Sequence, residues 1–160
     1  MKGSPKIIDI LNKSLEGELY AIMQYILHSE SCEDLGYHKL ATFLKQEAMQ
    51  EMHHAETLIE RILFLEGTPK LQMNRKVSWE KEIKKNLDAQ LAAEVEGIDI
   101  YKKGVKLSHE LEDTGTRNIL EDIIKDEEDH VDWIEAQLGL LDEVGVENYL
   151  AQQMHIGEKE

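Results

Sequence analysis

Apolar residues recur every three or four positions along most of the chain, and this pattern predicts four long helices. The first begins near Pro5, a residue suited to the first turn of a helix, with Ser4 placed to cap it. The second ends at the "EGTP" sequence of residues 66–69. The third starts in the stretch between Ser78 and Glu82, where the periodic pattern resumes.

The breaks between these helices differ in length. Short ones, "CEDLGYHK" at residues 32–39 and "EDTGTR" at residues 112–117, divide each half of the chain into two helices. A longer irregular segment follows "EGTP" and separates the halves. "EVGVENYLAQQ" at residues 143–153 predicts a turn and a short fifth helix. Together these signals predict an all-α four-helix bundle with one crossover connection, as one domain over residues 1–160.

Each long helix carries a glutamate inside its apolar stripe, where a charged residue is not expected. The four are Glu18, Glu51, Glu94 and Glu127. None of the stripes supplies a lysine or arginine, and ionised carboxylates buried without partners are very costly. His54 and His130 follow Glu51 and Glu127 by three residues, which places each pair on one helix face. These carboxylates must therefore be neutralised, paired or bound to metal.

The spacing of these residues repeats in the two halves of the chain. Glu18 and Glu51 are 33 residues apart, as are Glu94 and Glu127. A tyrosine follows the first glutamate of each half by seven residues: Tyr25 in one and Tyr101 in the other. Glu47 is a fifth carboxylate on a stripe, but the second half has no match for it. The chain is thus predicted to use one helical hairpin twice.

Either Glu-x-x-His motif alone would favour ordinary surface charge, the usual fate of glutamate. Placement on all four stripes with matched spacing favours a di-metal carboxylate site in the bundle core. The predicted ligands are Glu18, Glu51, His54, Glu94, Glu127 and His130. Four carboxylates would balance two divalent ions, and an oxygen-rich set with only two imidazoles suits iron or manganese better than structural zinc.

Composition limits the classes of partner that the protein can bind and indicates its cellular compartment. A formal net charge of −15 argues against nucleic acid or anionic lipid as a partner and favours cationic ligands. The sequence has no long apolar run, so neither a membrane span nor a signal peptide is predicted. The single cysteine, Cys32, excludes an internal disulfide and suits a reducing cytoplasm. We therefore expect a cytoplasmic protein.

Several stretches make the sequence resemble the bacterioferritins over nearly its whole length. They are "MKG" at residues 1–3, "GELYAIMQYILH" at 17–28, "EMHHAETLIERILFLEGTPKLQ" at 51–72 and "DEEDHVDWIEAQLGLLDEVGVENYL" at 126–150. The resemblance departs at Gln46 and Gln50, where several relatives have a histidine and an aspartate. An accessory iron site on the inner surface of a shell is therefore not implied.

The resemblance implies a ferroxidase in a shell of 24 identical subunits, built from two-fold dimers, that oxidises Fe(II) with O₂ or peroxide and stores ferric mineral. It implies that Glu18 and His54 serve one of two irons per subunit, that Glu94 and His130 serve the other, and that Glu51 and Glu127 bridge them. Tyr25 would hydrogen-bond to a ligand. A ferredoxin-type electron donor would support iron release.

Met52 lies on a second apolar face, beside Met49 and Ile59, that a four-helix bundle does not need for its core. Such a face predicts a subunit interface. In bacterioferritins the methionine at this place binds haem iron, one from each of two subunits, so the resemblance implies a shared b-type haem. His53, the nearest competitor, lies on a polar face.

Three alternatives are distinguishable. A haem-free bacterial ferritin would share the di-iron chemistry and differ at Met52. A rubrerythrin-like peroxidase would need Cys-x-x-Cys pairs, and the chain has only Cys32. A metal-free helical scaffold would leave the four stripe glutamates without partners.

Overall fold

The computed structural model of the chain describes residues 1–154, and it is a bundle of four long helices with a short fifth. The helices are α1 (Pro5–Asp34), α2 (His38–Phe64), α3 (Ile83–Glu110), α4 (Thr114–Val144) and α5 (Val146–Gln153). The expected domain of residues 1–160 includes residues 155–160, which lie outside the described part. Within residues 1–154 no helix is long and apolar enough to cross a membrane.

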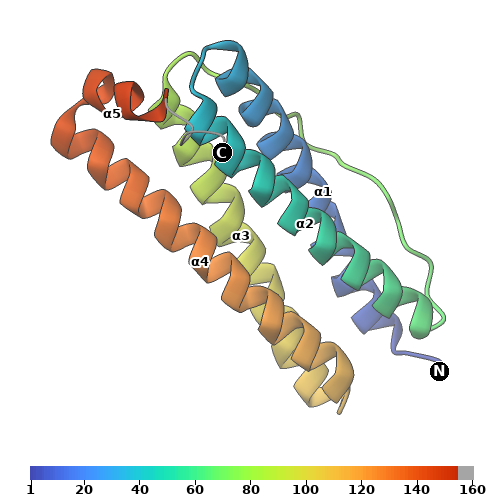
Figure 1. The fold of residues 1–160 in the computed structure, drawn as a ribbon. Coiled ribbons are helices and arrows are strands. Elements are labelled where there is room, and N and C mark those ends of the chain that lie inside the picture. The colour runs from blue at the N-terminus through green and yellow to red at the C-terminus, as the bar shows by residue number, and fades with distance from the viewer. Residues whose placement is uncertain (155–160) are drawn as a thin grey trace, which may run out of the picture.

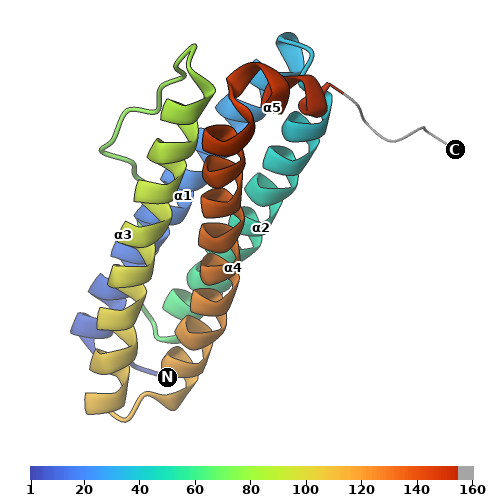
Figure 2. The ribbon, with the colours of Figure 1, turned by 90° about the vertical axis from the view of Figure 1, so that its left-hand side faces the viewer.

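Two antiparallel hairpins make up the bundle, α1 with α2 and α3 with α4 (Figure 1). The segment between α2 and α3 runs along the outside of the bundle from one end to the other, so that α2 and α3 point the same way (Figure 1). The short α5 crosses the far end of α4 (Figure 2). The predicted architecture, with one long crossover and a short C-terminal helix, is therefore confirmed.

The N-terminal ends of α1 and α3 each differ in one respect from the sequence prediction. Pro5 begins α1 as expected, but the side chain of Ser4 makes no capping hydrogen bond. Helix α3 begins only at Ile83, because the side chain of Asn86 reaches back and binds the chain ahead of the helix. Asn86 Oδ1 accepts from the Glu80 amide at 2.9 Å, and its Nδ2 donates to the Glu80 carbonyl at 2.7 Å. These bonds hold the end of the crossover in a non-helical path.

The apolar core is divided into two clusters of buried residues. One lies toward α5 and includes Leu40, Leu44 and Leu87. The other lies toward the N-terminus and includes Leu11 and Leu58. The stripe glutamates lie along the helices between the positions that form these clusters, so each helix changes from apolar to acidic and back at its middle. This arrangement places a polar layer inside the bundle.

A partly buried ion pair joins the two hairpins at one end. Arg61 of α2 donates to Asp113 Oδ1 at 2.6 Å and to Thr116 Oγ1 at 2.9 Å. Asp113 also caps α4 by accepting from the Thr116 amide at 3.0 Å. Burial acts to raise the pKa of Asp113, but the hydrogen bonds from Thr116 and the nearby Arg61 outweigh it, so this pKa is lowered.

We predict that Asp113→Ala lowers the free energy of unfolding by about 2 kcal/mol, because it removes a helix cap and leaves Arg61 without its partner. Thermal unfolding at a fixed protein concentration measures the change. The exposed Asp142, paired with Lys84 at 2.7 Å, is the matched control, and Asp142→Ala should cost less than about 1 kcal/mol.

The effect at Asp113 should also depend on pH with a definite sign. A lowered folded-state pKa contributes stability above the ordinary aspartate value of 3.8 and loses it as pH falls through the lowered value. The gap between wild type and Asp113→Ala should therefore narrow in acid. A gap that widens there would contradict this account.

Candidate di-metal centre

The six predicted ligands come together in the polar layer at the middle of the bundle. Helices α1 and α3 each contribute one glutamate, and helices α2 and α4 each contribute a glutamate and a histidine one turn later. They are Glu18, Glu51, His54, Glu94, Glu127 and His130, and none is more than 5% exposed. The apolar stripes explain this placement, because the same helix faces that bury the leucines also bury these residues.

The ligand atoms form two overlapping groups, each compact enough to hold a metal ion. One consists of Glu18, Glu51, His54 and Glu127, and the other of Glu51, Glu94, Glu127 and His130. Within each group the candidate ligand atoms lie within 4.8 Å of one another. Glu51 and Glu127 belong to both groups. The arrangement therefore fits two ions side by side with two shared carboxylates.

Both histidines turn the same nitrogen toward the carboxylates. His54 Nδ1 lies 3.0 Å from Glu51 Oε2 and 3.2 Å from Glu127 Oε1. His130 Nδ1 lies 3.0 Å from Glu51 Oε1 and 3.4 Å from Glu127 Oε2. Because Nδ1 of each ring faces the shared glutamates, Nδ1 is the nitrogen that can bind metal.

The other ring nitrogen of each histidine faces a carboxylate outside the ligand set. His54 Nε2 lies 3.0 Å from Asp126 Oδ2, and His130 Nε2 lies 2.8 Å from Glu47 Oε2. Carboxylates in this position orient a metal-binding imidazole and raise its basicity. Asp126 is thus the counterpart of Glu47 in the second half. It lies one residue before Glu127, whereas Glu47 lies four before Glu51, so matched spacing does not predict it.

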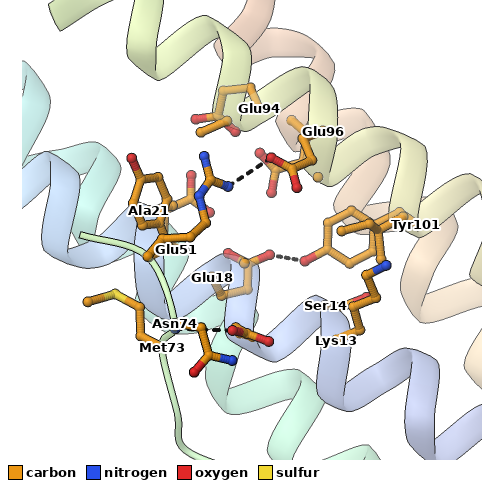
Figure 3. Close-up of a pocket in the computed structure, with 18 residues that line it drawn as sticks. Lys13, Ser14, Glu18, Ala21, Glu51, Met73, Asn74, Glu94, Glu96 and Tyr101 are labelled. Carbon is orange, nitrogen blue, oxygen red and sulfur yellow. Dashed lines mark hydrogen bonds and ion pairs between the residues drawn. The ribbon is translucent and has the colours of Figure 1, made fainter. Parts of the chain in front are cut away.

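Two tyrosines hold the two glutamates that are not shared. The Tyr25 hydroxyl donates to Glu94 Oε1, and the Tyr101 hydroxyl donates to Glu18 Oε1, as Figure 3 shows for the second pair. The sequence resemblance predicts the contact of Tyr25 with a ligand. For Tyr101 the sequence gives only the matched spacing, so its contact with Glu18 is a finding of the structure.

Burial and neighbouring charges set the protonation of the carboxylates. Burial raises the pKa of Glu94 to about 7, although His130 acts against it. Burial also raises the pKa of Glu18 well above its ordinary value, more than His54 lowers it. Burial acts in the same direction on Glu51 and Glu127, but hydrogen bonds from His130 and His54 outweigh it and lower both pKa values.

The histidines take up positive charge in return. Burial acts to lower the pKa of His54 and His130, but the surrounding carboxylates raise both well above the ordinary 6.5. In the described part of the chain, Glu51 Oε1, Glu127 Oε2 and His130 Nδ1 form no well-aligned hydrogen bond, although His130 Nδ1 lies 3.0 Å and 3.4 Å from the two oxygens. A pair of cations would give the carboxylate oxygens partners and would take the place of the protons that now balance their charge.

A pocket of about 180 Å³ connects this cluster to the surface between α1 and α3 (Figure 3). Small residues, Gly17 and Gly97, line its walls. The crossover segment passes over its mouth, where Arg75 Nη1 pairs with Glu96 Oε2 at 2.8 Å. The Arg75 guanidinium also lies 4.1 Å from the ring centroid of Tyr20.

Met52 lies away from this centre, on the outer face of α2. It is 40% exposed, and Met23, Ile26 and Met49 are also exposed large apolar residues on α1 and α2. His53 is exposed as well. The structure thus separates Met52 from the six clustered residues, and it leaves an apolar face uncovered around it.

The fold and the buried carboxylate–histidine cluster define the class of ferritin-like di-metal proteins, and a model of the ferritin-like domain matches residues 8–144. The bacterioferritins of Mycolicibacterium paratuberculosis and Mycobacterium avium are 40% and 39% identical to the chain, over 95% of it and 96% of each relative. The bacterioferritin of Brucella melitensis is 40% identical over 93% of the chain and 92% of its own length. The chain therefore belongs to the bacterioferritin family, as its sequence stretches predicted.

We predict that metal binding at the centre releases protons and tightens as pH rises from about 6 to about 8, because a raised pKa means that a proton must leave before the ligand binds. Calorimetric titration with Co(II) in buffers of different protonation enthalpy measures the release. Glu94→Gln has no proton to lose at that position and should release fewer. Binding without proton release would contradict the assigned protonation.

Proposed function

We propose that the protein stores iron by oxidising Fe(II) at the buried centre and keeping the ferric product inside a shell of its own subunits, in the cytoplasm. Membership of the bacterioferritin family supports iron storage. The observation that carries the oxidation step is the pair of overlapping ligand groups that share Glu51 and Glu127. Two metal positions side by side allow two one-electron donors to act on one oxidant.

In this proposal Fe(II) is the substrate, and each residue has a defined part. Glu18 and His54 bind one ion, and Glu94 and His130 bind the other. The two shared glutamates, Glu51 and Glu127, bridge the ions. The four carboxylates then carry the charge that two divalent ions balance, and neither a lysine nor an arginine is needed in the layer.

The electron count fixes the stoichiometry. Two Fe(II) supply two electrons, which with two protons reduce O₂ to H₂O₂, or reduce H₂O₂ to two molecules of water. Protons displaced from Glu18 and Glu94 when the ions bind would be available for this reduction, because burial raises the pKa of both carboxyl groups. Tyr25 keeps Glu94 oriented throughout by its hydroxyl hydrogen bond.

The shell and the haem belong to the same proposal. Twenty-four subunits would assemble from two-fold dimers, and the uncovered apolar face of α1 and α2 would lie at the dimer interface. Across that two-fold axis Met52 and its symmetry mate would supply both axial ligands of a b-type haem, since a thioether is a soft neutral ligand. A ferredoxin-type donor would deliver electrons for iron release.

Glu94→Ala and Glu127→Ala should each remove the rapid phase of Fe(II) oxidation, because each variant lacks a carboxylate that binds iron. Stopped-flow absorbance of the ferric product measures the rate. Glu128→Ala, on the exposed face next to Glu127, is the matched control and should oxidise Fe(II) like wild type.

The same samples test the shell. Light scattering should give a mass near 24 times 18.4 kDa for wild type and for all three variants. Unchanged rapid oxidation in both Glu94→Ala and Glu127→Ala would reject the assigned ligands.

Met52→Leu should abolish the visible absorption band of bound haem, because leucine offers no ligand atom, while shell mass and Fe(II) oxidation stay at wild-type levels. Met49→Leu changes a more exposed methionine nearby and should leave the band intact. Loss of the band in His53→Ala, with its retention in Met52→Leu, would transfer the ligand role to His53.

A further inference from the structure

Two buried tyrosines cross between the hairpins in opposite directions. Tyr25 of α1 donates to Glu94 of α3, and Tyr101 of α3 donates to Glu18 of α1. Both tyrosines are almost fully buried, at 1% and 2% exposure. Each hairpin therefore uses its tyrosine to hold the glutamate of the other hairpin.

The hydroxyl of Tyr101 has no packing role that would explain it. The Tyr101 ring belongs to the apolar cluster near the N-terminal end, where phenylalanine would fill the same space. A buried hydroxyl is costly unless it is paired, and Glu18 is the hydrogen-bond partner that the structure gives it. The hydroxyl is thus tied to this carboxylate.

The hydrogen bond divides the two oxygens of Glu18 between two tasks. Oε1 accepts from Tyr101, whereas Oε2 is the oxygen that faces His54 Nδ1, at 3.7 Å. An oxygen fixed by a neighbour prevents the carboxylate from rotating freely about its last bond. The free oxygen is consequently directed at the place where an ion bound by His54 would lie.

We propose that Tyr101 is a positioning residue for the Glu18–His54 metal position, matching what Tyr25 does for the Glu94–His130 position. The inference rests on the proposed di-metal function. At both metal positions a tyrosine hydroxyl then orders one carboxylate before an ion binds. Losing the Tyr101 hydroxyl should weaken one position selectively.

Co(II) is a suitable probe, because its visible absorption reports the ligands of each ion. Two backgrounds isolate the positions: His130→Ala leaves Glu18–His54 complete, and His54→Ala leaves Glu94–His130 complete. In the first background Tyr101→Phe should weaken Co(II) binding by about 10-fold and alter the absorption bands, while Tyr25→Phe should have little effect. In the second background Tyr25→Phe should weaken Co(II) binding, and Tyr101→Phe should have little effect.

Controls separate positioning from a general loss of structure. Tyr20 lines the same pocket, and its hydroxyl accepts a hydrogen bond from Gln24 at 3.4 Å. Tyr20→Phe removes that hydroxyl and should leave both Co(II) titrations unchanged. Tyr101→Leu removes the same hydroxyl with different packing and should repeat the loss seen for Tyr101→Phe. Unfolding curves of the metal-free variants show whether each is folded.

The outcomes distinguish the inference from the function on which it rests. Failure of the wild-type protein to bind Co(II) with ligand-field bands would overturn the di-metal function and the inference together. Normal binding in wild type, with equal affinity and spectra in both folded Tyr101 variants, would overturn the positioning role alone. Equal weakening at both positions would also overturn it, since a positioning residue acts on one carboxylate.

Discussion

Four glutamate carboxylates lie in a buried layer at the middle of the bundle, and their charge has to be balanced there. The apolar clusters on both sides supply the burial energy that holds these groups in place. Positive charge comes from two histidines and from cations or protons, because the four stripes contain no lysine or arginine. Stability and chemistry therefore depend on the same balance of charge.

The surroundings of the layer follow from that balance. Asp126 and Glu47 face the outer nitrogens of the histidines and leave the inner nitrogens directed at the shared glutamates. The tyrosine hydroxyls hold the other two glutamates. In consequence the six candidate ligands are largely ordered by partners outside the set, an arrangement that would lower the cost of binding an ion. Partners of this kind are as much part of the centre as the ligands.

Much of the fold and of the candidate site could be predicted from the sequence, and the features that could not be predicted have physical reasons. Apolar periodicity is strong in long helices, so the bundle and the stripe glutamates could be predicted. Asp126 could not, because it is a half-exposed residue whose contact with His54 depends on how α4 faces α2. Arg75 and the pocket mouth lie on the crossover, where no periodic pattern exists. The ligand assignment of Glu18, Glu51 and their partners remains a prediction for experiment.

The even division of the ligands between the hairpins links metal binding to the assembly of the bundle. Each hairpin forms from contacts close in sequence, which is the rapid part of folding, whereas the two halves meet only after the crossover closes a long loop. Neither hairpin alone carries a complete set for either ion. An ion bound by these candidate ligands would therefore favour the docked state over the separated hairpins by mass action. Slow docking would then appear as slow capture of metal by a chain that is still folding.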